Sequence, residues 1–235
     1  MEKYKLPVAA ALVAIGIFLG GFAIAKAIIT TTEMSRVVNV KGLSVREVPA
    51  DKVIWPITFK EIGNNLTDLY NTINTKNNII ISFLKTNGIE ENEIIIAAPE
   101  IVDLQAERYG NQNYLYRYNV TSIITVTSNK VNLVTDLMLK QADLIKKGVA
   151  IIVGNYQYQP TFTFTGLNDI KPQMIEEATI NARTTAEKFA ADSQSKLGKI
   201  KTANQGQFTI SDRDNNTPQI KEVRVVTSVT YFLED

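Results

Sequence analysis

The chain has 235 residues with 25 basic and 24 acidic side chains, so its formal net charge is only +1. Hydrophobic residues make up 45% and charged residues 21% of the sequence, a composition typical of globular proteins. The absence of cysteine and histidine excludes disulfides, thiolate nucleophiles, a Ser-His-Asp triad and the usual zinc sites. No long basic run is present, which argues against nucleic-acid binding.

The first apolar segment, Leu6 to Ala25, contains no charged residue and follows Lys3 and Lys5. A helix of about 20 residues reaches about 30 Å, the thickness of a bilayer's hydrocarbon core. Two interpretations stay open: an uncleaved anchor that holds the chain in the membrane through residues 6–25, or a signal peptide cleaved after the A-x-A pattern of Ala23 and Ala25. The length of the segment favours the anchor, because signal peptides usually have shorter apolar regions.

The remaining chain divides into a polar linker (30–36) and a folded domain (37–235), with the anchor or signal segment occupying residues 1–29. Strand patterns begin at Val37, bend at Pro49 and resume over Val53–Glu61. Leu66–Asn87 has the apolar spacing of a helix, with Asn64 or Asn65 as its N-cap and Gly88 as its left-handed end. Alternation and spacing then predict a strand over Ile94–Leu104, a strand over Tyr116–Thr127, a helix over Val131–Lys147 and a strand over Ile151–Thr165.

These elements repeat the order strand, helix, strand, which is typical of a ferredoxin-like βαββαβ sandwich. A third, long helix is expected over Asp169–Leu197, with Gly198 closing it. Two strands, Lys201–Ile210 and Glu222–Leu233, complete the chain as a hairpin. The predicted fold is therefore α+β, with an antiparallel sheet, both early helices on one face, and one N-terminal membrane or signal helix. Alanines at every fourth position of the third helix predict close packing against another element: Ala178, Ala182, Ala186 and Ala190.

Two acidic motifs have the residue types of a catalytic or metal site. Glu90, Glu91 and Glu93 cluster in a helix-to-strand connection, where charged side chains normally face solvent. Asp212, Asp214 and Asn216 have the spacing of a calcium loop. That loop lacks the glycine and the bidentate glutamate that an EF-hand requires at its sixth and twelfth positions, so we interpret it as a solvated turn. No catalytic, metal-binding or cofactor-binding residue is assigned.

The aromatic segment Tyr109–Tyr118 contains Arg117 and can be read as a stacking surface for bases or sugars, or as a hairpin tip leading into a strand. We favour the hairpin. Asn65 and Asn119 fit the N-glycosylation pattern, but the second lies in a predicted strand.

The segments Val40–Val48 and Ala50–Phe59, the spaced alanines, the run Lys196–Ile200 and the closing strand Val223–Leu233 resemble SIMPL-domain proteins in their order along the chain. The resemblance covers about residues 37–234. That family comprises bacterial envelope proteins, including periplasmic immunogenic proteins and proteins associated with oxidative-stress defence. It implies a periplasmic or membrane-anchored α/β domain that often self-associates, and it transfers no catalytic residue to this chain.

We therefore expect a non-enzymatic envelope protein, anchored in the inner membrane with its domain in the periplasm, or soluble in the periplasm if the N-terminus is cleaved. It would act through self-association and contacts with envelope partners, with a link to envelope or oxidative stress implied by the resemblance. The alternative is a small-molecule or cell-wall binding module that uses the aromatic strands Tyr114–Tyr118 and Tyr156–Phe164. No cofactor and no nucleic-acid partner are expected.

Overall fold

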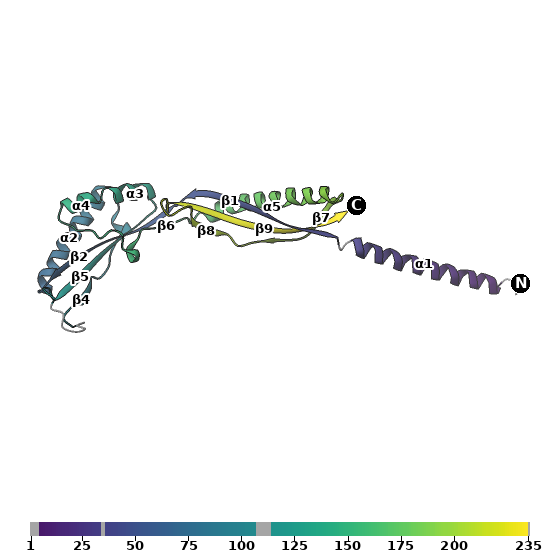
Figure 1. Cartoon of the computed structure of the whole chain (residues 1–235), viewed down its shortest axis with the longest axis horizontal. Coiled ribbons are helices and arrows are strands. Elements are labelled where there is room, and N and C mark those ends of the chain that lie inside the picture. The colour runs from purple at the N-terminus through teal and green to yellow at the C-terminus, as the bar shows by residue number, and fades with distance from the viewer. Residues whose placement is uncertain (1–4, 34–35, 107–113, 235) are drawn as a thin grey trace. The chain divides into compact units, whose positions relative to one another are not determined.

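The computed structural model describes residues 5–33, 36–106 and 114–234 (Figure 1). Within these ranges the chain forms five α-helices and two antiparallel sheets, which confirms the predicted α+β class. The chain divides into two compact units. The first unit comprises Met1–Arg46, Asn168–Thr209 and Val223–Asp235, and the second comprises Glu47–Leu167 and Ile210–Glu222.

Helix α1 extends over Lys5–Glu33 and contains the whole apolar segment Leu6–Ala25. It also continues into the range 30–36 that the polar composition assigns to a linker. Across the described part of the chain, no helix combines the length and the hydropathy that crossing a membrane requires.

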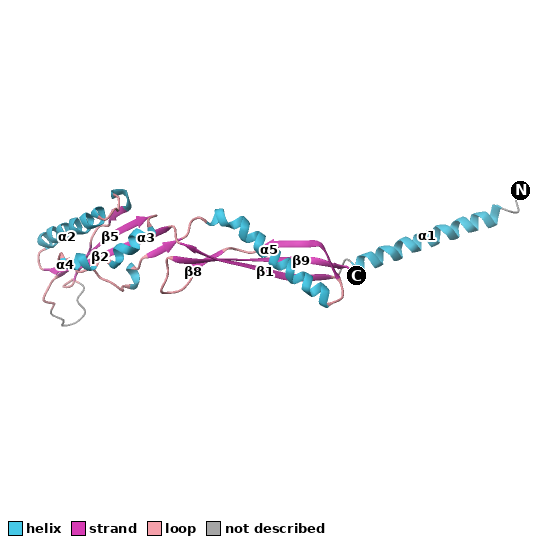
Figure 2. Cartoon of the chain, turned by 90° about the horizontal axis from the view of Figure 1, so that it is seen from above, coloured by secondary structure: helices cyan, strands magenta, loops and turns pink. Residues whose placement is uncertain are grey.

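The sheet of the first unit has the strand order β1-β9-β7, and β8 also pairs with β9. Helix α5, Leu167–Asp192, lies along this sheet (Figure 2). The predicted alanine stripe of this helix is confirmed, because all four alanines are at most 2% exposed. The strands are β1 (Val37–Pro49), β7 (Lys196–Gln205), β8 (Thr209–Asp212) and β9 (Ile220–Glu234).

The sheet of the second unit has the order β3-β5-β2-β6, with β4 also paired to β5, and all of these pairs are antiparallel. Along the chain the elements follow the order β2, α2, β3, β4, β5, α3, α4, β6. The strands are β2 (Lys52–Gly63), β3 (Ile94–Ile96), β4 (Glu100–Asp103), β5 (Tyr118–Ser128) and β6 (Thr161–Thr163).

Helices α2 (Leu66–Thr86), α3 (Val131–Leu139) and α4 (Ala142–Lys146) cover one face of this second sheet (Figure 1). Strand pairing places Ile57 opposite Ile124 on the helix-covered face. Because side chains alternate along a strand, Thr58 and its partner Ile123 lie on the other face. The core between sheet and helices includes Val53, Trp55, Ile57, Phe59, Ile73, Ile80, Leu84, Ile124, Val126, Val134, Leu137 and Leu144.

The predicted boundaries of α2 are confirmed. The Asn65 side chain accepts a hydrogen bond from the Thr67 N–H at 2.9 Å, which caps the helix start. Gly88 has a φ of 95°, and the Ile89 N–H donates to the Leu84 carbonyl at 3.1 Å. This left-handed end lets the chain turn back and bury Ile89.

Three other predicted elements are wrong in extent. The strand expected over Ile94–Leu104 is two short strands, β3 and β4, with Pro99 between them, and proline has no N–H to donate to a sheet. The helix expected over Val131–Lys147 is interrupted, because Asp143 N–H donates to Lys140 over a three-residue turn. The strand expected over Ile151–Thr165 is reduced to one bridge at Ile151, the 3₁₀ turn η3 (Tyr156–Tyr158) and β6.

The third helix is also shorter than predicted. Helix α5 ends at Asp192, and Gln194 has a φ of 56°, so the chain reverses several residues before Gly198. Leu197, expected at the end of the helix, lies in β7 and pairs with Leu233 of β9. The strand expected over Lys201–Ile210 is divided into β7 and β8.

Candidate functional site

The Glu90–Glu93 cluster has a structural role. Glu93 accepts hydrogen bonds from the Ser128 hydroxyl at 2.6 Å and from the Glu90 N–H at 2.8 Å, and its carboxylate pairs with Lys130 at 3.2 Å. Burial opposes ionisation of Glu93, but these hydrogen bonds outweigh it and lower its pKa. The cluster caps the 3₁₀ turn Glu91–Glu93 and fixes it to the end of β5.

The loop that contains Asp214 is closed by its own hydrogen bonds. The Asp214 carboxylate accepts from the Asn216 N–H at 2.8 Å and from the Thr217 N–H at 2.9 Å, and it pairs with Arg213 at 3.0 Å. The Thr217 hydroxyl and Arg213 lower the pKa of Asp214. Among the residues that the structure describes, no group of three metal-ligating side chains comes together.

The described part of the aromatic segment is held by an ion pair. Residues 109–113 of the segment lie outside the described ranges. Arg117 binds Asp103 with an Nη2–Oδ2 distance of 2.8 Å, and its guanidinium lies 4.9 Å from the centre of the Tyr118 ring. The Arg117 hydrogen bond lowers the pKa of Asp103. These contacts fasten β4 to β5.

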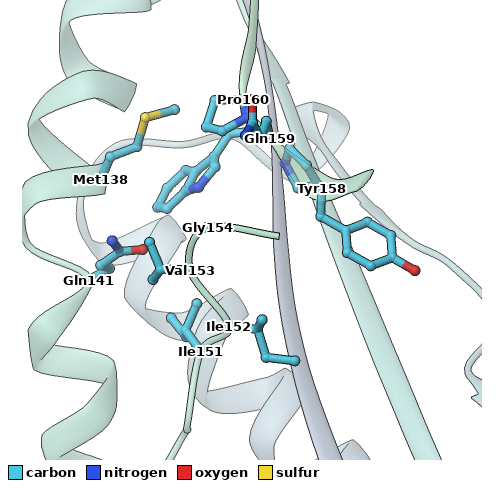
Figure 3. Close-up of a pocket in the computed structure, with 11 residues that line it drawn as sticks. Met138, Gln141, Ile151, Ile152, Val153, Gly154, Tyr158, Gln159 and Pro160 are labelled. Carbon is cyan, nitrogen blue, oxygen red and sulfur yellow. The ribbon is translucent and has the colours of Figure 1, made fainter. Parts of the chain in front are cut away.

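The segment from Ile151 to Thr161 lines two depressions of the second unit. The first has a volume of about 100 Å³ and is lined in part by Trp55, which is 4% exposed. Met138 and Gln141 border it from the helical side, and the Tyr158 ring points away from them (Figure 3). The Tyr158 hydroxyl donates to Glu100 at 3.3 Å; burial, together with the negative charge of Glu100, raises the tyrosine's pKa.

The second depression has a volume of about 430 Å³, and polar groups dominate it. We call it the Asp212–Lys221 hollow. The Lys221 side chain is only 8% exposed and forms an ion pair with Asp212, whose side chain is 49% exposed. The hollow is lined by Tyr156, Gln157, Gln159, Pro160, Thr161, Phe162, Asp212, Pro218 and Lys221.

Lys221 is not among the residues predicted from the sequence, and Asp212 was predicted only as part of a solvated turn. A signal was present, because Lys221 is in phase with the buried residues Val223 and Val225 of β9. A lysine at an inward position of a strand needs a charged or polar partner. The partner, Asp212, is nine residues earlier in the chain.

Two further surfaces are apolar. A groove of about 290 Å³ is bordered by Leu66, Tyr70 and Ile101, all of which are exposed. In the first unit, Leu43 and Val45 of β1 are each 44% exposed. They alternate with Gly42 and Ser44, which contact α5, and therefore lie on the opposite face of the sheet.

Comparison with known proteins gives one family. The family model described as SIMPL, protein of unknown function (DUF541), matches residues 38–231. No curated protein matches the chain significantly.

Proposed function

The chain belongs to the SIMPL family, and on that premise we propose that it is a non-enzymatic bacterial envelope protein that acts through self-association and contacts with envelope partners. We also propose that its folded part faces the periplasm, with a link to envelope or oxidative stress. The uncharged segment Leu6–Ala25 supports export. The absence of histidine and cysteine supports a non-enzymatic role, because these residues supply the commonest general base and a common nucleophile.

Self-association is supported mainly by strand β1. Among the described strands, β1 pairs only with β9, so one edge of this 13-residue strand has no partner strand. Such an edge presents N–H and C=O groups to which another strand can add. Leu43 and Val45 add exposed apolar area beside this edge.

Light scattering of the full chain in detergent, combined with chemical crosslinking, tests this proposal. We expect an oligomer that dissociates when Leu43→Lys and Val45→Lys are introduced together, because two charges oppose burial of the strand. Leu139→Lys is the matched control, since Leu139 is 81% exposed on α3 of the second unit. A monomer at every protein concentration, or equal dissociation by the control, would contradict the proposal.

A second candidate function is small-molecule or cell-wall binding, supported by the Asp212–Lys221 hollow. One wall of the hollow lies in Tyr156–Phe164, the aromatic segment that the sequence predicts for this alternative. We further propose that the second unit is a ferredoxin-like variant, in which β3 and β4 together take the place of one strand and α3 and α4 that of one helix; its sheet order β3-β5-β2-β6 supports this. A thermal-shift screen with envelope glycans and metabolites tests the binding function, and a complete lack of stabilisation would remove it.

A further inference from the structure

The Asp212–Lys221 hollow has the dimensions of a ligand site. Its volume of about 430 Å³ falls in the range of about 300–1,000 Å³ that small-molecule sites occupy. Two segments of the second unit form its walls: η3 and β6 on one side, and the residues around the β8–β9 turn on the other. Pro160 and Pro218 lie one in each wall and restrict the backbone there.

The polar groups of the hollow define what it can recognise. An ammonium group only donates hydrogen bonds, and an ionised carboxylate only accepts them. The Lys221 ammonium and the Asp212 carboxylate lie side by side in the hollow. The Asp212 side chain is also exposed enough to accept a hydrogen bond from a ligand. The pair carries no net charge, so it gives no overall attraction to a phosphate or to an amine.

A hydroxyl group both donates and accepts, and two neighbouring hydroxyls can therefore satisfy the carboxylate and the ammonium together. Gln157 and Gln159 line the same hollow and add amide donors and acceptors. Tyr156 is 91% exposed and lines the hollow, so it offers an aromatic ring against which the C–H face of a sugar can lie.

We infer that the hollow binds neighbouring hydroxyl groups of an uncharged saccharide, with Asp212 accepting from one hydroxyl, Lys221 donating to the next and Tyr156 stacking on the ring. The inference rests on the second proposed function, and it is independent of self-association. It names the ligand class and the residues that contact the ligand.

Isothermal titration of the full chain with cellotetraose and with maltotetraose tests the inference, in a detergent whose headgroup is not a sugar. We expect at least one of the two to bind with a Kd of about 1 mM or tighter. Tyr156→Ala and Asp212→Asn are each expected to weaken binding by about tenfold or more, because each removes a central contact. Tyr116→Ala is the matched control, since Tyr116 is 40% exposed and lies outside the hollow.

Asp212→Asn leaves the nearly buried Lys221 without its carboxylate, so folding of this variant is checked by circular dichroism. Tyr156→Ala removes an exposed ring and tests the inference independently of that ion pair. No binding of either tetrasaccharide to the folded protein would overturn the inference, as would unchanged affinity in Tyr156→Ala. Inorganic phosphate that competes for the same site would overturn the uncharged ligand class. Light scattering on the same samples separates these outcomes from a failure of self-association.

Discussion

At the scale of single residues, Gly42 determines how closely β1 approaches α5. A Cβ atom added at this position would lie 1.7 Å from the Ala178 carbonyl oxygen and 2.5 Å from the Ala182 nitrogen. Both atoms belong to the helix backbone, so no side-chain rotation relieves the overlap. We expect Gly42→Ala to lower the free energy of unfolding by about 3 kcal/mol, the upper end of the usual cost of overpacking. Urea denaturation followed by circular dichroism measures the change.

Gly63→Ala is the matched control for this substitution. The nearest neighbour of its added Cβ is the Leu69 side chain at 3.2 Å, which can shift by a few tenths of an ångström. The two glycine variants should therefore differ clearly in stability. Equal stability of both variants would show that β1 does not contact the backbone of α5 at Gly42.

At the scale of elements, the end of α5 depends on an unusual backbone conformation. Among the residues that the structure describes, Gln194 is the non-glycine residue with a positive φ, which is 56°. This conformation lets the Ser195 N–H donate a hydrogen bond to the Ala190 carbonyl at 2.9 Å. Left-handed φ costs a residue with a Cβ about 1–2 kcal/mol, and glycine avoids that cost. We expect Gln194→Gly to raise the free energy of unfolding by about 0.5–1 kcal/mol, after the greater entropy of glycine in the unfolded chain is subtracted.

The same urea measurement on Gln207→Gly provides the comparison, because Gln207 lies in the described part of the chain and does not have a positive φ. There the substitution should leave stability unchanged or lower it slightly, since only the unfolded-state entropy changes. A loss of stability in Gln194→Gly similar to that in Gln207→Gly would argue against a strained helix end.

The elements that could be predicted are those whose local signals agree with their packing. Helix α2 has an asparagine cap, an apolar face and a terminal glycine. Its predicted start, Leu66, matches the structure, and its predicted end, Asn87, is one residue beyond the observed end at Thr86. The segment after Gly148 has apolar and aromatic residues typical of strands, yet Gly154 has a φ of 83° and the chain pairs with β2 only at its two ends. Pairing depends on which strand lies alongside, and local composition does not contain that information.

The candidate site was predictable only in part, for a similar reason. The aromatic residues of Tyr156–Phe164 predicted a binding surface in that segment, and one wall of the hollow lies there. The other wall contains Asp212 and Lys221, which lie 56 and 65 residues after Tyr156 in the chain, and folding of the second unit brings the two walls together. Their charges have opposite sign and little effect on the net charge, so composition gave no indication of the pair.

At the scale of the whole molecule, the proposed export and membrane attachment both depend on the segment Leu6–Ala25. We expect the protein from the native host to fractionate with membranes and to have an intact mass that includes the segment Leu6–Ala25, because this apolar segment is longer than that of typical signal peptides. Replacing Ala23 and Ala25 with leucine removes the A-x-A pattern, and in an uncleaved anchor it should change neither the start of the chain nor the fractionation. A soluble protein whose mass begins at Lys26, and which keeps its N-terminal segment in the leucine variant, would instead establish a cleaved signal peptide. In that case the two units would reach the periplasm without an anchor, and β1 would have to support self-association in a freely diffusing protein.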